Sequence, residues 1–160
     1  MPLTSRVAWL HQAVYDDLLA QADRHALNET GGLLLGYRHS ATEVVITDTI
    51  GPGPNAGHRR TGFDPDTNWQ TRELVRRYAA ADRRLCYLGD WHTHPRGRTA
   101  LSRIDRHTLG AIARHPDARC PHPVMAVLAG GDPWTLAVRQ LTPRPLYRSR
   151  IDRLEVQLHA

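Results

Sequence analysis

Side chains that can bind a metal or move a proton are concentrated between positions 92 and 105 of the chain: His92, His94, Ser102 and Asp105. Two imidazoles and one carboxylate are a common protein ligand set for catalytic zinc, which keeps a fourth coordination position for water. The sequence therefore predicts a zinc site with His92, His94 and Asp105 as its ligands. Ser102, three residues before Asp105, belongs to the same group.

The two histidines follow a short apolar stretch, residues 85–91, that is typical of a β-strand. In an extended chain, residues two apart point to the same side, so His92 and His94 should project together and Thr93 should point away. Pro95 favours this geometry, because a residue before proline is disfavoured in the helical region. The spacing thus predicts two imidazoles that share one face of the strand end.

Residues 102–114 are expected to form a helix, because Leu109, Ile112 and Ala113 recur at helical spacing. Asp105 lies four residues before Leu109, at the start of this apolar row. A carboxylate there is costly to bury unless it is paired or binds a metal. Taken alone, the same residues are equally typical of an N-cap at Ser102 with Asp105 completing a capping box.

Hydrolysis at a zinc site also needs a proton acceptor that is not itself a ligand. Glu29 is the candidate, since two glycines at positions 31 and 32 and an apolar run follow it. Paired glycines allow another segment of backbone to approach closely. On residue types alone, a solvated glutamate in a turn after the first helix explains Glu29 equally well.

Glu29 with its Gly-Gly pair, together with His92-x-His94-x7-Ser102-x2-Asp105, resembles the JAMM signature of JAB/MPN-domain metallopeptidases. The likeness covers roughly residues 5–141. It implies an α/β fold of the cytidine-deaminase-like JAB/MPN type, a mixed β-sheet flanked by helices. It also implies that His92, His94 and Asp105 bind Zn2+, that Glu29 polarises the water and shuttles its proton, and that Ser102 hydrogen-bonds the water or the oxyanion.

Within that family, the segment around Trp91 is most similar to prokaryotic stand-alone members that lie beside ubiquitin-like conjugation genes, including antiphage operons. The resemblance implies a zinc-dependent (iso)peptidase that hydrolyses the bond after the C-terminal tail of a ubiquitin-like protein. That tail would bind in a groove near the zinc. Two alternatives stay open: a hydrolase that releases an amino acid from a sulfur-carrier protein, and a non-catalytic, zinc-stabilised binding module.

Length and composition set the frame for these expectations. A chain of 160 residues is expected to be one domain, here a catalytic core over 5–141 and a C-terminal extension over 142–160. No apolar run is long enough to span a bilayer, and the N-terminus does not resemble a signal peptide. Two cysteines, Cys86 and Cys120, make a disulfide framework unexpected, so a cytoplasmic location is predicted.

The net charge of +5 comes from 21 basic residues that are all arginine. They are dispersed, so a solvated basic surface is expected, with a weak preference for an acidic partner face and no nucleic acid partner. A metal-dependent nuclease remains a third alternative, suggested by basicity alone.

The remaining elements position these side chains. Strands are expected at 6–10, 32–38, 43–50, 85–91, 124–128 and 134–141, and helices at 11–27, 66–81 and 102–114. In the helix over 66–81, Leu74, Val75, Tyr78 and Ala79 are predicted to face inward, and Cys86 and Trp91 are assigned to buried positions. Two arginine-containing loops, 51–65 and 95–101, are expected to flank the zinc. The tail over 142–160 fits an edge strand, a helix or an extension that contacts a partner.

Overall fold

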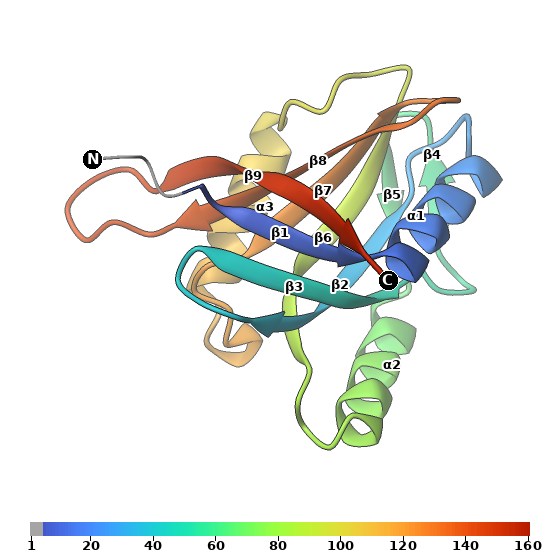
Figure 1. The fold of residues 1–160 in the computed structure, drawn as a ribbon. Coiled ribbons are helices and arrows are strands. Elements are labelled where there is room, and N and C mark those ends of the chain that lie inside the picture. The colour runs from blue at the N-terminus through green and yellow to red at the C-terminus, as the bar shows by residue number, and fades with distance from the viewer. Residues whose placement is uncertain (1–4) are drawn as a thin grey trace.

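Seven strands form one mixed sheet that closes on itself in the computed structural model, which describes residues 5–160 (Figure 1). The strand order is β1-β3-β2-β6-β7-β8-β9, and β1 also pairs with β9. Pairing is parallel for β1 with β3 and β9 and for β6 with β7, and antiparallel elsewhere. Three helices flank this sheet, which confirms the predicted α/β class with a mixed sheet flanked by helices.

The elements follow the order predicted from periodicity, with shifts of one to three residues at several ends. The strands of the main sheet are β1 (Val7–His11), β2 (Gly31–Arg38), β3 (Glu43–Ile50), β6 (Cys86–Pro95), β7 (Val124–Gly130), β8 (Thr135–Thr142) and β9 (Arg150–His159). A separate hairpin consists of β4 (Gly57–Arg59) and β5 (Gly62–Asp64), and the helices are α1 (Gln12–Arg24), α2 (Thr67–Ala80) and α3 (Arg103–Arg114), with a short 3-10 turn at Pro116–Ala118.

Strand β6 runs four residues further than its apolar sequence indicates and contains both histidines. It extends because it has a partner on each side: His92 pairs with Gly31 of β2 and with Val127 of β7, and Pro95 still pairs with Gly130. A central strand can therefore carry polar residues to its end. The histidines lie on this rigid strand and not in a loop after it.

The core lies inside the closed sheet, with α1 packed against it. Val14, Leu18 and Ala22 of α1 are buried and join the apolar side chains of the strands. Trp91 is completely buried in this core, as predicted for an aromatic residue at this strand, and its Nε1 donates to the Ile50 carbonyl at 3.2 Å. A second apolar cluster fills the space between α3 and the outer face of β7 and β8, where Leu109 is buried.

The C-terminal tail is a strand, but it is not at an edge. Residues 150–159 form β9, which pairs with β8 on one side and with β1 on the other. Leu154 on this strand is buried in the core. The segment beyond residue 141 therefore closes the sheet, which the short alternating pattern in the sequence could not distinguish from a peripheral extension.

The inward face predicted for α2 was wrong. Val75 is 64% exposed and Tyr78 is 44% exposed, and the buried residue of this helix is Gln70. The helix projects from the sheet (Figure 1) and is tied to it by polar contacts. Gln70 Nε2 donates to the Gly51 carbonyl at 3.0 Å, and Arg77 pairs with Asp48 of β3 at 2.8 Å.

The burial predicted for Cys86 was also wrong. Cys86 is exposed because it is the first residue of β6, where the strand emerges from the core. Its thiol donates to the Gly36 carbonyl at 3.3 Å.

Candidate metal centre

His92 and His94 extend from the same face of β6, as the strand periodicity predicted. Their Nε2 atoms lie 3.0 Å apart. Thr93 points the other way and is completely buried, and its hydroxyl accepts a hydrogen bond from the Thr30 amide at 3.0 Å. The two imidazoles therefore lie on one face of β6. Thr93, on the opposite face, connects β6 to the segment that carries Glu29.

Asp105 reaches the histidines from the first turn of α3. Its Oδ1 lies 3.2 Å from His92 Nε2, and its Oδ2 lies 3.5 Å from His94 Nε2. Ser102 is the N-cap of this helix: its hydroxyl accepts from the Asp105 amide at 3.1 Å, and its own amide donates to Asp105 Oδ2 at 2.7 Å. The capping box considered from the sequence is therefore present, and it orients the carboxylate toward the histidines.

The three side chains offer donor atoms that all lie within 4.8 Å of one another, and they fit a divalent metal. A shared tetrahedral ion with bonds of about 2.0–2.1 Å would place its donor atoms about 3.3 Å apart, close to the separations of 3.0–3.5 Å found here. His94 Nδ1 donates to the Arg98 carbonyl at 2.8 Å, so in the neutral ring it is Nε2 that carries the lone pair a metal would take.

Attraction between opposite charges dominates this cluster. Burial raises the pKa of Asp105, but hydrogen bonds from His92 and His94 outweigh it and hold the pKa well below the usual range of a carboxyl. The hydrogen bond between His94 and Asp105 also raises the pKa of His94, although burial acts in the opposite direction. The site therefore favours an anionic Asp105 with positive charge beside it, the condition that a metal cation satisfies.

Glu29 lies at the mouth of β2 beside these residues. It lines a cleft of about 440 Å3 together with His92, His94, Ser102 and Asp105, so all five side chains predicted from the sequence meet in one place. Burial raises the pKa of Glu29, and the nearby His94 and His92 partly offset this effect. A carboxyl with a raised pKa in a cleft is suited to accept and release a proton.

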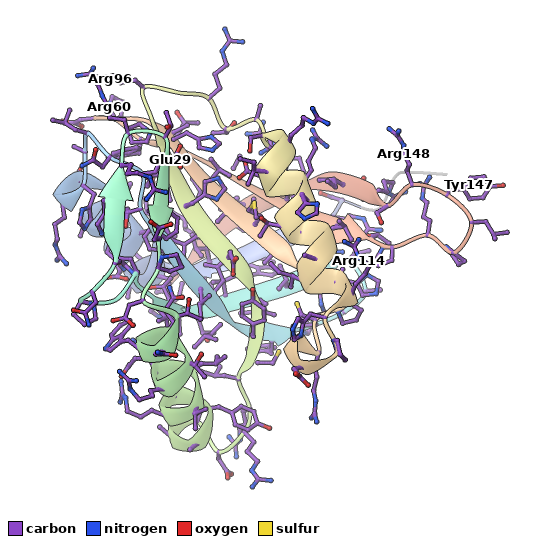
Figure 2. The ribbon with its side chains drawn as sticks, turned by 180° about the vertical axis from the view of Figure 1, so that it is seen from behind. Glu29, Arg60, Arg96, Arg114, Tyr147 and Arg148 are labelled. Carbon is purple, nitrogen blue, oxygen red and sulfur yellow. The ribbon has the colours of Figure 1, made fainter. Side chains whose placement is uncertain are left out.

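The hairpin β4–β5 holds Glu29 by its backbone. Residues 51–65 were expected to be a loop, so this hairpin was not predicted. The Glu29 amide donates to the Arg59 carbonyl at 2.8 Å, and His58 Nδ1 donates to the Glu29 carbonyl at 3.1 Å. The His58 ring stacks on His25 at 3.9 Å between centroids. Figure 2 shows Glu29 next to this hairpin.

The paired glycines after Glu29 allow close approach, as predicted. A Cβ on Gly31 would lie 2.4 Å from the Trp91 carbonyl oxygen and 2.6 Å from the ring of Phe63. A Cβ on Gly32 would lie 1.8 Å from the Ile50 carbonyl oxygen. Because glycine has no side chain, β2 and the hairpin can pack closely next to Glu29. Phe63 of the hairpin forms part of the cleft wall.

The two flanking loops contribute differently from the expectation. Thr61, Phe63 and Pro65 of the first loop line the cleft, but none of the arginines of either loop is among its lining residues. Arg59 pairs with Asp64 across the hairpin, and both are exposed. Arg60 and Arg96 are exposed as well, and Figure 2 shows both on the same side of the molecule as Glu29.

Comparisons with known proteins identify the family of this chain. Residues 11–142 match the family described as prokaryotic homologs of the JAB domain. The chain is 38% identical over 151 residues to a probable metalloprotease of Sinorhizobium fredii, covering 92% of each protein. It is 30% identical over 126 residues to a CD-NTase/cGAS isopeptidase of Enterobacter hormaechei, covering 78% of this chain and 67% of that protein.

A solved structure supports the fold independently of close sequence similarity. The solution structure of a protein from Desulfitobacterium hafniense superposes with a TM-score of 0.66 at 16% identity, covering 95% of this chain and 92% of that one. Among the described residues, no helix is both long and apolar enough to cross a membrane. The chain therefore belongs to the prokaryotic homologues of the JAB domain, and it is a metalloprotease or isopeptidase of that family.

Proposed function

We propose that this protein is a zinc-dependent isopeptidase that hydrolyses the bond after the C-terminal tail of a ubiquitin-like protein, and that the chain is one catalytic domain. The observation that carries the proposal is the convergence of His92, His94 and Asp105 in a cleft that also holds Glu29, a carboxylate outside the ligand set. When bound by these three residues, zinc would supply Lewis-acid polarisation of water and of the substrate carbonyl.

Glu29 supplies the proton transfers. Its carboxylate takes a proton from the attacking water and passes it to the nitrogen of the departing amine. Burial keeps the pKa of Glu29 above its ordinary value, which brings it closer to the pH at which both transfers are efficient. The Glu29 backbone is held by two hydrogen bonds with the hairpin, one to the Arg59 carbonyl and one from the His58 ring.

Ser102 stabilises the negative charge that develops on the substrate oxygen. Its hydroxyl oxygen already accepts from the Asp105 amide, so its hydrogen is free to donate. Because the helix cap fixes the position of this hydroxyl, the donor is oriented before the substrate arrives.

The cleft suits an extended polypeptide tail. Leu33, Phe63 and Ile104 give it apolar walls next to the polar cluster. Strand β5 pairs only with β4 among the described strands, so its other edge offers backbone groups beside the cleft. An extended tail can add to such an edge as a further strand.

The names of two relatives support a proposal for the biological role. Proteins named CD-NTase/cGAS isopeptidase occur in Enterobacter hormaechei and Escherichia coli and share 30–31% identity with the matched part of this chain. We propose that this protein acts in a bacterial system that conjugates a ubiquitin-like protein, in the cytoplasm and in antiphage defence. It would there remove a modifier from its targets or process the modifier precursor.

Intact-mass spectrometry of a cleavage panel tests the proposal. Ubiquitin-like proteins encoded beside the gene are presented as lysine-linked conjugates, as linear fusions and as cysteine adducts, with Glu29→Gln and a chelator in parallel. Release of the free modifier from lysine conjugates, abolished by both controls, is expected. Cleavage of the cysteine adduct alone would replace the proposal by carrier-protein hydrolysis. Zinc binding without any cleavage would replace it by a binding module.

A further inference from the structure

Three arginines, which we call the arginine cluster, gather on the outer face of the sheet: Arg106 of α3, Arg139 of β8 and Arg153 of β9. Arg139 and Arg153 stand directly opposite each other in the antiparallel pair of β8 and β9. Like charges in directly opposite positions destabilise a sheet. The fold therefore tolerates an electrostatic cost at this position.

No ion pair relieves that cost within residues 5–160. None of the three guanidinium groups forms an ion pair there, whereas Arg59, Arg76, Arg77 and Arg150 all have carboxylate partners. The pKa of Arg139 is lowered, mainly by burial and to a smaller extent by the charges of Arg153 and Arg106. Arg139 instead donates to the Thr99 carbonyl, a neutral acceptor. The cluster thus presents unneutralised positive charge.

The cluster lies beside the metal centre. Arg106 directly follows Asp105 in α3, and Thr99, which accepts from Arg139, lies between the histidines and α3. Leu141 packs in the same cluster as Leu109 of α3, so Arg139, two residues before Leu141 on β8, shares the face that α3 covers. Arg106 and Arg153 themselves are exposed.

The basic surface continues to the connection between β8 and β9. Leu146 is 87% exposed and Tyr147 is 76% exposed, with the exposed Arg144 and Arg148 on either side. Figure 2 shows this connection projecting from the molecule, with α3 between it and the β4–β5 hairpin. Arginine and tyrosine are among the residue types enriched at the positions that contribute most to binding in protein interfaces.

We propose that the arginine cluster and the β8–β9 connection bind an acidic segment of the protein substrate, on the side of the cleft away from the β4–β5 hairpin. The inference rests on the proposed peptidase function for the identity of the partner as a protein. Guanidinium groups pair with carboxylates in a bidentate geometry, so aspartate or glutamate side chains would supply the missing counter-charge. Leu146 and Tyr147 add apolar contacts that favour a polypeptide over a phosphate backbone.

Fluorescence anisotropy of the full chain with a labelled glutamate-rich peptide tests this surface. A glutamine-rich peptide and a single-stranded oligonucleotide serve as comparison ligands. Binding of the glutamate peptide is expected, and Arg106→Glu and Arg153→Glu should each weaken it by roughly 3- to 10-fold. Arg72→Glu, which makes the same charge change at an exposed position of α2, is the matched control and should leave binding nearly unchanged.

Arg153→Glu also separates a binding role from a structural one. It turns the opposed pair of Arg139 and Arg153 into an attractive pair, so Tm should rise while peptide binding falls. Equal loss of binding in Arg72→Glu would show that only net charge matters and would overturn the proposal. Tighter, cluster-dependent binding of the oligonucleotide would overturn it in favour of nucleic acid. Because no turnover is measured, these results are independent of the cleavage panel.

Discussion

The ionised form of Glu29 is needed for the reaction but lowers the stability of the folded protein. Its pKa is raised by burial, so the folded state binds a proton at Glu29 more tightly than the unfolded state does. The stability contributed by that proton is complete below the unfolded pKa and is lost as pH rises through the folded pKa. At neutral pH the ionised carboxylate therefore costs stability, and this cost persists because the reaction needs the charge.

Glu29→Gln is accordingly expected to lose turnover by about 100- to 10,000-fold and yet to raise the Tm of the metal-free protein at neutral pH. The gain in Tm should shrink at acidic pH, where Glu29 is itself protonated. Thermal unfolding of both proteins across pH measures this difference. Asp117→Asn, a carboxyl-to-amide change at an exposed position, is the control and should show no such gain. A Tm gain for Glu29→Gln that does not vary with pH would contradict the argument.

The ligand residues predict a stability that depends on metal. Added zinc should raise the Tm, because zinc binds the folded state. A free zinc concentration of about 100 times the Kd adds about 2.7 kcal/mol to the free energy of unfolding. His92→Ala removes one of the three donors, so both the bound zinc and the rise in Tm should be lost. Glu29→Gln should keep both. Zinc content by elemental analysis and Tm with and without chelator measure the effect, and an undiminished zinc response in His92→Ala would reject this ligand set.

At the scale of elements, the parts of the site that follow from local geometry were predictable. The two histidines share a face because of strand periodicity, and Asp105 is oriented by a cap that spans the four residues 102–105. The hairpin that holds Glu29 was not predicted, because His58 and Glu29 meet only through the tertiary fold. The prediction of a buried face on α2 was wrong for the same reason. An apolar row indicates a buried face only where another element covers it.

The hairpin makes its own prediction. His58→Phe keeps an aromatic ring next to His25 but removes the donor to the Glu29 carbonyl. Loss of that hydrogen bond should lower kcat by roughly 10-fold and leave zinc content unchanged. Hydrogen exchange of the Glu29 amide, which donates to Arg59, should accelerate as the hairpin loosens. If kcat falls while the exchange rate stays the same, His58 does not act by positioning Glu29.

At the scale of the whole molecule, one closed sheet carries the ligand strand, the strand after Glu29 and the strands of the arginine cluster. Strand β6 lies between β2, which begins just after Glu29, and β7, which pairs with β8. The relative positions of His92, His94 and Glu29 therefore depend on the register of a few neighbouring strands, and α3 adds Asp105 to them. The strand that completes this sheet comes from the segment whose structure the sequence left open, since nothing local in residues 142–160 shows that both of its edges are paired.

Removal of residues 143–160 should therefore damage the fold far more than loss of a peripheral tail would. The truncation leaves β1 and β8 with one unpaired edge each and takes Leu154 out of the core. Loss of one buried leucine alone costs about 2–5 kcal/mol, a large share of the stability of a small domain. Urea unfolding followed by near-UV circular dichroism should show a lower midpoint or no cooperative transition. Leu146→Ala with Tyr147→Ala, which changes only exposed side chains of the same segment, should keep the full midpoint, and a truncated chain that unfolds like the full one would show that β9 contributes nothing to closing the sheet.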